Sequence, residues 1–186
     1  REEGVLKRWR GTPLPTGVYI GGFVGSAIVL AFVGVVFMLL VGVVFYDLQV
    51  EAAKMPGAVL TFTVGVASFA ALGMALAALV PTASSAAAAA NAIILPLAFV
   101  SNVFIVTGDD APAWMTTLGD IFPLKPFVQG IQDSFNPFID APAIDWAKLG
   151  YVALWGLVGL AVAIKYFRWE PAPGGVTSRR RRTRPT

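Results

Sequence analysis

Residues 18–46 read VYIGGFVGSAIVLAFVGVVFMLLVGVVFY, an apolar stretch without a single charged side chain. The hydrocarbon core of a bilayer is about 30 Å thick, and an α-helix that rises about 1.5 Å per residue crosses it in roughly 20 residues. This stretch is long enough to span a membrane and to tilt within it. The whole chain of 186 residues is 56% hydrophobic and only 13% charged, whereas soluble domains carry about 25% charged residues. The sequence therefore predicts a membrane protein.

Three further stretches complete a predicted bundle of four transmembrane helices. Residues 58–80 are uncharged, and a proline lies just outside each end. Because proline disrupts the interior of a helix, these two prolines are expected to mark where the helix starts and stops. Residues 83–106 are also uncharged, but their first half, ASSAAAAANA, is only weakly apolar and is expected to pack against other helices. Residues 146–169 have a lysine near each end, where its long side chain can reach the interface. The predicted fold class is an all-α, polytopic membrane bundle.

Lys and Arg residues concentrate at the two ends of the chain, which predicts that both ends are cytoplasmic. Segments 1–15 and 171–186 are rich in these residues, whereas connection 47–57 holds one lysine and two acidic residues, and connection 107–145 holds one lysine and six aspartates. Four spans return the chain to the side on which it starts, so the span count agrees with the charge distribution. We expect a multi-pass protein of the plasma membrane with the two acidic connections outside.

The residue inventory limits the chemistry that the chain can perform. It has no Cys and no His, so it has no thiolate or imidazole metal site, no cysteine nucleophile and no Ser-His-Asp triad. No catalytic residue, metal or cofactor is predicted. The spans contain no Asp or Glu, which ion-coupled carriers place within the membrane. The phosphate-binding pattern GxxxxGK[ST] is also missing, so a partner must supply any ATP hydrolysis.

The basic tail, residues 171–186, includes the run RRRRTRP. Such clusters attract anionic membrane lipid at about 1 kcal/mol per basic residue. Nucleic-acid binding is not expected, because no aromatic residues are interleaved with the arginines and no fold surrounds them.

Polar residues in the third predicted span are candidates for lining a pathway. They are Asn91, Pro96, Ser101 and Asn102. Amides within lipid need partners in the protein or in a water-filled cavity. The alternative is that these groups bond to a neighbouring helix and that Pro96 only kinks the span.

Glycines in the first span give it a face that permits close helix packing. Gly21 and Gly25 form a small-xxx-small pair, which lets two helix backbones approach each other. Ordinary packing within the chain and contact with a second copy both explain this pair.

The N-terminal run REEGVLKRWRGTPLPTGVYIGG, residues 1–22, resembles the motif RExGTLxRLRxTPLPxxxYxxG of permeases in the type-2 ABC exporter family. Val5 and Trp9 stand where Thr and Leu are usual. The resemblance implies that segment 1–15 is a cytoplasmic coupling helix that contacts an ATPase subunit. The contact residues that it implies are Arg1, Glu2, Leu6, Lys7, Arg8, Trp9, Arg10 and Pro13. Taken without the resemblance, a short amphipathic basic segment beside a membrane is an interfacial anchor.

A second, collinear match lies in connection 107–145. The run DDAPAWMTTLGDIFPLKPFVQGIQDSF resembles the late signature of the same family, in which a proline and a tryptophan precede a short helix and PLxPxV follows it. Asn102 stands where Gly is usual and Gln132 where Arg is common. Candidate outer gate residues from this region are Pro112, Trp114, Pro123 and Phe127.

This connection is too long for a loop without structure of its own. We expect a first short helix through Gly119, capped by Asp109 or Asp110 and with a proline in its first turn. A second helix is expected at about residues 126–135. Both are apolar and too short to span, so they are predicted to be re-entrant or interfacial. A simple amphipathic surface loop is the alternative.

Family permeases have six spans, so the resemblance implies that these four are the third to the sixth and that two lie upstream. It implies partnership with an ATP-binding ABC subunit and with a second permease copy. The function that it implies is the membrane-spanning permease of an ATP-driven exporter of drug-like, lipid-like or glycan substrates. The alternatives are a membrane scaffold or anchor without transport activity and a small secondary transporter.

Overall fold

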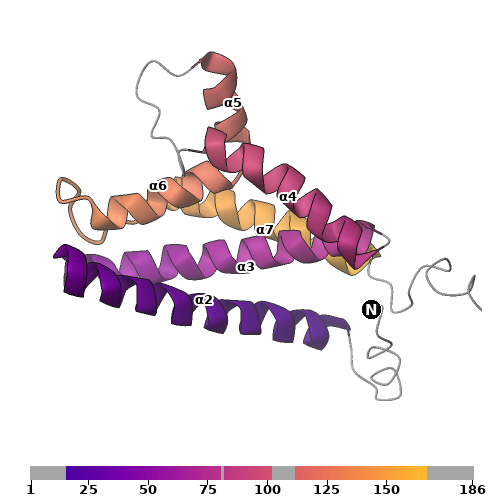
Figure 1. Cartoon of the computed structure of the whole chain (residues 1–186), viewed down its shortest axis with the longest axis horizontal. Helices are drawn as coiled ribbons and strands as arrows, with labels where there is room; N and C mark the ends of the chain where they lie inside the picture. The colour runs from indigo at the N-terminus through magenta and orange to yellow at the C-terminus, as the bar shows by residue number, and fades with distance from the viewer. Residues whose placement is uncertain (1–15, 81, 102–111, 167–186) are drawn as a thin grey trace, which may run out of the picture.

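The computed structural model describes residues 16–80, 82–101 and 112–166, and every regular element in these ranges is a helix (Figure 1). The predicted all-α class is therefore confirmed. The elements are α2 (Thr16–Tyr46), the 3-10 helix η1 (Ala52–Lys54), α3 (Met55–Leu79), α4 (Ala83–Val100), α5 (Ala113–Ile121), α6 (Leu124–Phe135) and α7 (Trp146–Tyr166). The proposed coupling segment 1–15 and the basic tail lie outside the described residues.

Three helical stretches of the described chain are long and apolar enough to cross a membrane, namely Gly17–Tyr46, Ala52–Leu79 and Trp146–Tyr166. They correspond to three of the four predicted spans. The second span starts earlier than predicted, because Pro56 lies in the first turn of α3 and not before the helix. Proline is tolerated there, since the N–H groups of the first turn have no partner within the helix.

The predicted third span is described only as far as the end of α4. The apolar helical stretch Ser85–Val100 within it is shorter than the other three stretches. The helix begins at a cap in which the Thr82 hydroxyl oxygen accepts a hydrogen bond from the Ser85 N–H at 3.2 Å, and Pro96 lies inside it. Whether this span extends through residue 106 stays a prediction.

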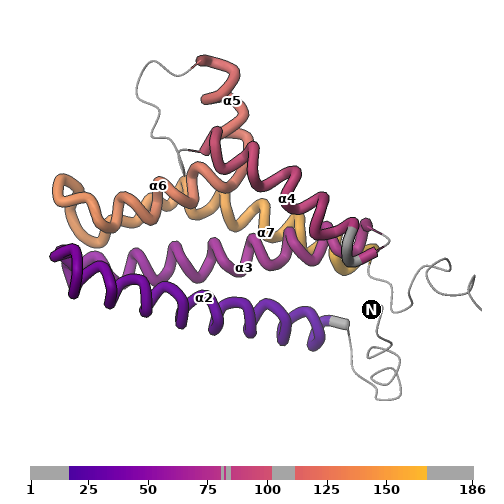
Figure 2. The backbone as a smooth tube through the Cα atoms, viewed as in Figure 1, coloured from indigo at the N-terminus to yellow at the C-terminus, as the bar shows by residue number. Residues whose placement is uncertain are grey.

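Helix α3 is the centre of the bundle, since it contacts α2, α4, α6 and α7. Figure 2 shows α2, α3 and α7 running along one another, with α6 beside the half of α3 that contains Met55. Helix α4 lies toward the other half of α3, and α5 projects away from α2 and α3 (Figure 1). We call the end of the bundle at which α3 and α7 begin the loop end.

Small residues hold α3 against α7. Buried Gly156 and Gly159 of α7 lie on buried Ser68 and Ala71 of α3. A Cβ atom on Gly159 would lie 2.9 Å from the backbone nitrogen of Leu72, closer than real Cβ atoms approach. The two helices are therefore in backbone contact, as is common where small residues line a membrane helix interface.

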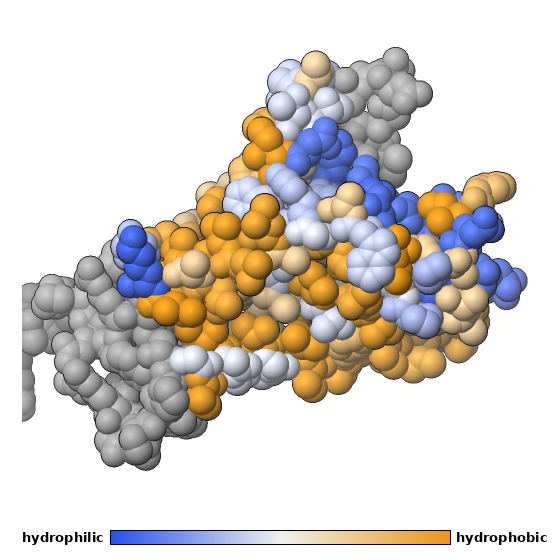
Figure 3. Space-filling model, turned by 180° about the vertical axis from the view of Figure 1, so that it is seen from behind, coloured by the Kyte–Doolittle hydropathy of each residue, from blue (hydrophilic) through white to orange (hydrophobic). Residues whose placement is uncertain are grey.

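The surface of the bundle matches a lipid environment. Hydrophobic residues cover most of the face shown in Figure 3, and hydrophilic residues gather toward one end. On α2, Leu30, Phe37 and Met38 are 74%, 68% and 74% exposed. Apolar patches of this extent are rare on soluble monomers.

The glycine face of α2 is open. A Cβ atom on Gly21 or Gly25 would meet no atom within 4 Å in the described chain. Packing of this pair within the described chain is therefore not observed, and contact with another chain stays a prediction.

Candidate functional site

Helix α5 corresponds to the first helix predicted in connection 107–145, but it starts and ends at other residues than expected. Pro112 holds the N-cap position, and its carbonyl oxygen accepts a hydrogen bond from the Met115 N–H at 2.9 Å. The expectation that Pro112 lies within the first turn is therefore wrong, and the suggested caps Asp109 and Asp110 lie outside the described residues. The helix also continues past Gly119 to Ile121.

Gly119 serves close packing and does not end the helix. A Cβ atom on Gly119 would lie 2.9 Å from the backbone oxygen of Val100. This contact joins α5 to the end of α4. The prediction that the helix ends at Gly119 is wrong, because the local sequence does not show which backbone packs against this glycine.

Helix α6 confirms the second predicted helix. It begins slightly earlier than expected, at Leu124, and ends at Phe135 with Asn136 as its C-cap. Pro126 falls within its first turn, where proline leaves no intrahelical hydrogen bond unmade.

Helix α6 runs antiparallel to α3, from inside the bundle toward the loop end. Asn136 lies against Lys54, Gly130 against Thr61, and Phe127 against Gly65. Gly65 lies about 15 Å along the axis of α3 from Met55, since a helix rises about 1.5 Å per residue. Helix α6 therefore packs lengthwise against α3, and its re-entrant or interfacial position in the membrane stays a prediction.

The ring of Phe127 fills a notch on α3, which we call the Gly65 notch. A Cβ atom on Gly65 would overlap this ring. The ring also meets Phe69 edge to face, with ring centroids 5.4 Å apart and an angle of 72° between the planes. Phe127 is therefore a packed residue of the α3–α6 interface.

The other candidate gate residues do not converge on Phe127 as one group. Pro123 is buried at the start of α6, whereas Pro112 is exposed and Trp114 is 62% exposed on α5. The region therefore has a packed part on α6 and an exposed part on α5.

The predicted pathway residues also separate. Asn91 and Pro96 are exposed on α4, and Asn102 lies outside the described residues. Ser101 is fully buried, and its hydroxyl has no hydrogen-bond partner in the described chain.

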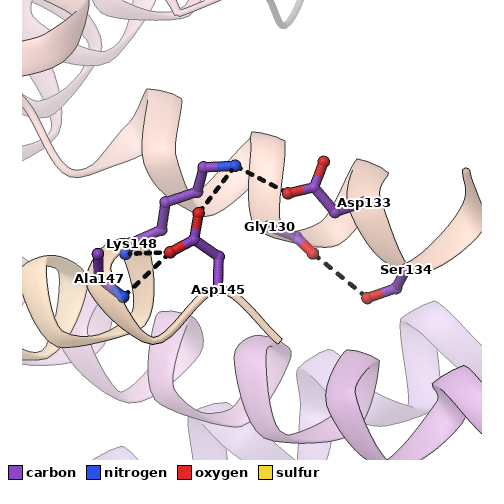
Figure 4. A network of polar contacts seen from close by, with 6 residues as sticks. All are labelled: Gly130, Asp133, Ser134, Asp145, Ala147 and Lys148. Atoms are coloured by element: carbon purple, nitrogen blue, oxygen red, sulfur yellow. Dashed lines mark hydrogen bonds and ion pairs between the residues drawn. The ribbon is translucent and has the colours of Figure 1, made fainter. Parts of the chain in front are cut away.

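A polar network that the sequence analysis missed fastens α6 to α7 (Figure 4). The Lys148 ammonium donates a hydrogen bond to Asp133 of α6 at 2.8 Å and lies 3.3 Å from Asp145, which directly precedes α7. The side chains of these three residues are 24% to 38% exposed. The ammonium is thus shared between one carboxylate on α6 and one next to its own helix.

Asp145 also caps α7. Its Oδ1 atom accepts hydrogen bonds from the backbone N–H groups of Ala147 at 3.0 Å and Lys148 at 3.1 Å. The backbone hydrogen bond from Lys148 is the main cause that lowers the pKa of the Asp145 carboxyl, and the Lys148 ammonium adds to it against partial desolvation. An Asp just before a predicted helix start is a recognisable N-cap, so this role was readable from the sequence.

A second lysine fastens the C-terminal end of α6. The Lys54 ammonium donates a hydrogen bond to the backbone oxygen of Asn136 at 2.9 Å and pairs with Glu51. Lys54 is only 2% exposed. Charge counting had treated it as a residue of an external connection, but burial makes it a structural contact between η1 and α6.

A small cavity lies between α3, α6 and α7 beneath the ion pair, with space for about one water molecule. The residues that line it are Thr61, Pro126, Phe127, Gly130, Asp145, Lys148, Leu149 and Val152. Asp145 and Lys148 are the charged residues of this lining, and most of the others are apolar.

These features define a multi-pass α-helical membrane protein in which a helical insertion folds back against the spanning helices. The chain belongs to the ABC-2 type transporter family, whose profile matches residues 1–136. The match includes segment 1–15 and all of α6. No curated protein and no solved structure matches the chain. Family membership makes the chain a membrane permease component of an ABC transporter and not its catalytic subunit.

Proposed function

We propose that this chain is the permease subunit of an ATP-driven exporter in the plasma membrane, with both of its ends on the cytoplasmic side. Its substrates are drug-like, lipid-like or glycan molecules. The observation that carries the proposal is the family match over residues 1–136. It includes the segment that resembles a coupling helix and the helix that folds back into the bundle.

The energy for transport comes from an ATP-binding partner. The sequence has no phosphate-binding loop, and family permeases work with a separate ATPase. Segment 1–15 offers Trp9 together with Arg8 and Arg10, and Trp and Arg are residue types that dominate interface energies. These residues form the proposed contact through which ATP hydrolysis drives the spans.

A second permease copy completes the pathway. Asn91 is exposed on α4, although an amide facing lipid lacks hydrogen-bond partners. The glycine face of α2 is also open in the described chain. A second copy against α4 would cover Asn91 and place it beside a pathway, which α6 shields at the loop end.

Transport into inverted membrane vesicles tests the proposal. Vesicles that contain the full-length permease and its ATPase are given fluorescent amphiphiles, labelled lipids and labelled glycans, with ATP or a non-hydrolysable analogue. We expect ATP-dependent accumulation of at least one class, because an exporter in inverted vesicles moves its substrate inward. Failure of every class with active ATPase, or equal accumulation with the analogue, contradicts the proposal.

Variants of α4 test the pathway assignment in the same vesicles. Asn91→Leu keeps approximate size but removes the amide, and it is expected to reduce the transport rate while leaving membrane insertion intact. Ile94→Leu is the matched control, since Ile94 is 55% exposed on the same helix and stays apolar. Equal transport rates for the two variants remove Asn91 from the pathway.

A further inference from the structure

Helix α6 is fastened at its C-terminal end by two lysines from different elements. Lys54, just before α3, donates to the carbonyl oxygen of Asn136, and Lys148 of α7 bonds to Asp133. Asp133 and Asn136 lie within one turn of each other. One end of α6 is therefore tied to both long helices that flank it.

Burial makes the Lys54 contact costly to break. Its ammonium is almost completely buried, and a buried charge that loses a hydrogen-bond partner is strongly destabilising. If α6 moved away from η1, the Lys54 ammonium would keep the Glu51 carboxylate as its one partner among the described residues. This contact favours one fixed position of α6.

The rest of α6 is seated against α3, and the end of α5 that precedes it is bonded to α7. Phe127 fills the Gly65 notch, and Gly130 admits the methyl group of Thr61 at 3.1 Å from its Cβ position. Just before α6, the Tyr151 hydroxyl of α7 donates to the backbone oxygen of Ile121 at 2.6 Å. The segment from Ile121 to Asn136 is thus held at both of its ends and in its middle.

The contrast with α4 is clear. Its apolar residues Ile93, Ile94 and Leu95 are at least half exposed, and Pro96 lies inside the helix. Proline removes an intrahelical hydrogen bond and permits bending. A helix with these properties is easier to displace than α6.

We propose that α3, α6 and α7 move as one rigid body during transport, with Lys54 and Lys148 as the positioning residues that clamp α6 between the two long helices. Helix α6 then keeps its position and shields the pathway at the loop end, and the pathway opens when α4 moves relative to α6. This inference rests on the proposed function, because the cycle is that of an ABC permease. The clamp itself is a statement about packing and is testable without transport.

A disulfide between α3 and α6 tests the rigid body. The chain has no cysteine of its own, so Thr61→Cys with Gly130→Cys introduces the reactive pair. The Thr61 Cγ2 atom lies 3.1 Å from the Gly130 Cβ position, which brings the two Cβ positions near the roughly 3.5–4.5 Å that a disulfide requires. The full-length permease with its ATPase, in lipid, is oxidised without nucleotide and during ATP turnover.

If α3, α6 and α7 move as one body, the cross-linking yield is the same without nucleotide and during ATP turnover. ATP hydrolysis and transport are then unchanged after cross-linking. Loss of transport on oxidation, restored by a reductant, would show that α6 must leave α3 and would overturn the proposal. A parent protein that neither transports nor hydrolyses ATP contradicts the proposed function instead. The cross-linking yield without nucleotide then still tests the clamp.

Lysine variants in this cysteine background test the clamp. Lys54→Met and Lys148→Met are expected to lower the cross-linking yield several-fold, and Lys54→Arg to restore most of it. Lys125→Met is the matched control, because Lys125 lies on α6 but pairs with Asp120 of α5, and its yield should equal that of the parent. If Lys54→Met fails to insert, Asp133→Asn removes the partly exposed partner of Lys148 instead. Equal yields across all inserted variants would overturn the role of the lysines.

Discussion

Adding one methyl group to Gly159 should push α7 away from α3. The atoms that its Cβ would meet are all backbone atoms, with the Leu72 nitrogen at 2.9 Å and the Leu72 Cα and Ala71 carbonyl carbon at 3.0 Å. Backbone atoms cannot rotate aside as a side chain does, so relief requires a shift of the whole helix. Gly150 lies on the same helix, and a Cβ there would meet no atom within 4 Å in the described chain.

The pair of variants Gly159→Ala and Gly150→Ala isolates the cost of this overpacking. Each gains about 0.5–1 kcal/mol of helix propensity, and this gain cancels in the difference between them. Overpacking a well-packed site costs about 1–3 kcal/mol. We therefore expect the difference in unfolding free energy between the two variants to be about 1–3 kcal/mol.

Thermal unfolding in detergent micelles, followed by tryptophan fluorescence, measures this difference. For a chain of this size, 1 kcal/mol shifts Tm by about 2–4 °C, so Gly159→Ala should melt roughly 2–12 °C below Gly150→Ala. Equal Tm values for the two variants would refute the reasoning, because they would mean that α3 and α7 are not in backbone contact at Gly159.

Three further changes have expected outcomes. Phe127→Ala should empty the Gly65 notch and destabilise the chain by up to about 3–5 kcal/mol, whereas Trp114→Ala, at a 62% exposed position, should change unfolding free energy by no more than about 0.5 kcal/mol. The lowered pKa of Asp145 means that its stabilising contribution is complete above its ordinary value of 3.8 and is lost as pH falls through the lower folded value. The decline of Tm at acidic pH should therefore be smaller in Asp145→Ala. A cysteine replacing Phe138, which is 93% exposed, should react with an impermeant thiol reagent on intact cells, whereas one replacing Arg180 should react only after permeabilisation.

Each of these outcomes has a result that opposes it. A Phe127→Ala variant as stable as the parent would mean that the Gly65 notch is not occupied in the membrane. An Asp145→Ala variant with the acid decline of the parent would assign that decline to other carboxylates. Reaction of the cysteine at position 180 before permeabilisation would overturn the predicted orientation.

Local patterns predicted the helices well because length and apolar composition alone determine a spanning helix. The uncharged residues 18–46 predicted α2 to within two residues of its ends, and the helix expected at about residues 126–135 ends at Phe135 as predicted. The start of α3 was misplaced because a proline is equally compatible with the first turn of a helix and with the residue before it.

Contacts between distant segments could not be predicted in this way. Lys54 and Asn136 are 82 positions apart, and nothing in the sequence near either residue indicates the other. The seating of Phe127 on Gly65 depends on how α6 folds back, which neither hydropathy nor charge counting determines. For the same reason the sequence assigned Lys54 to a solvent-facing connection, although it is buried.

Reconstitution with the ATPase measures whether this chain couples to ATP hydrolysis through segment 1–15. Full-length permease is reconstituted with its ATPase, and substrate-stimulated hydrolysis and co-purification are compared for the parent and for Trp9→Ala combined with Arg8→Glu. The account predicts that the ATPase co-purifies with the parent and that the double variant loses both co-purification and stimulated hydrolysis while its spans remain inserted. Unchanged values in both assays would contradict it and would leave segment 1–15 as an interfacial anchor.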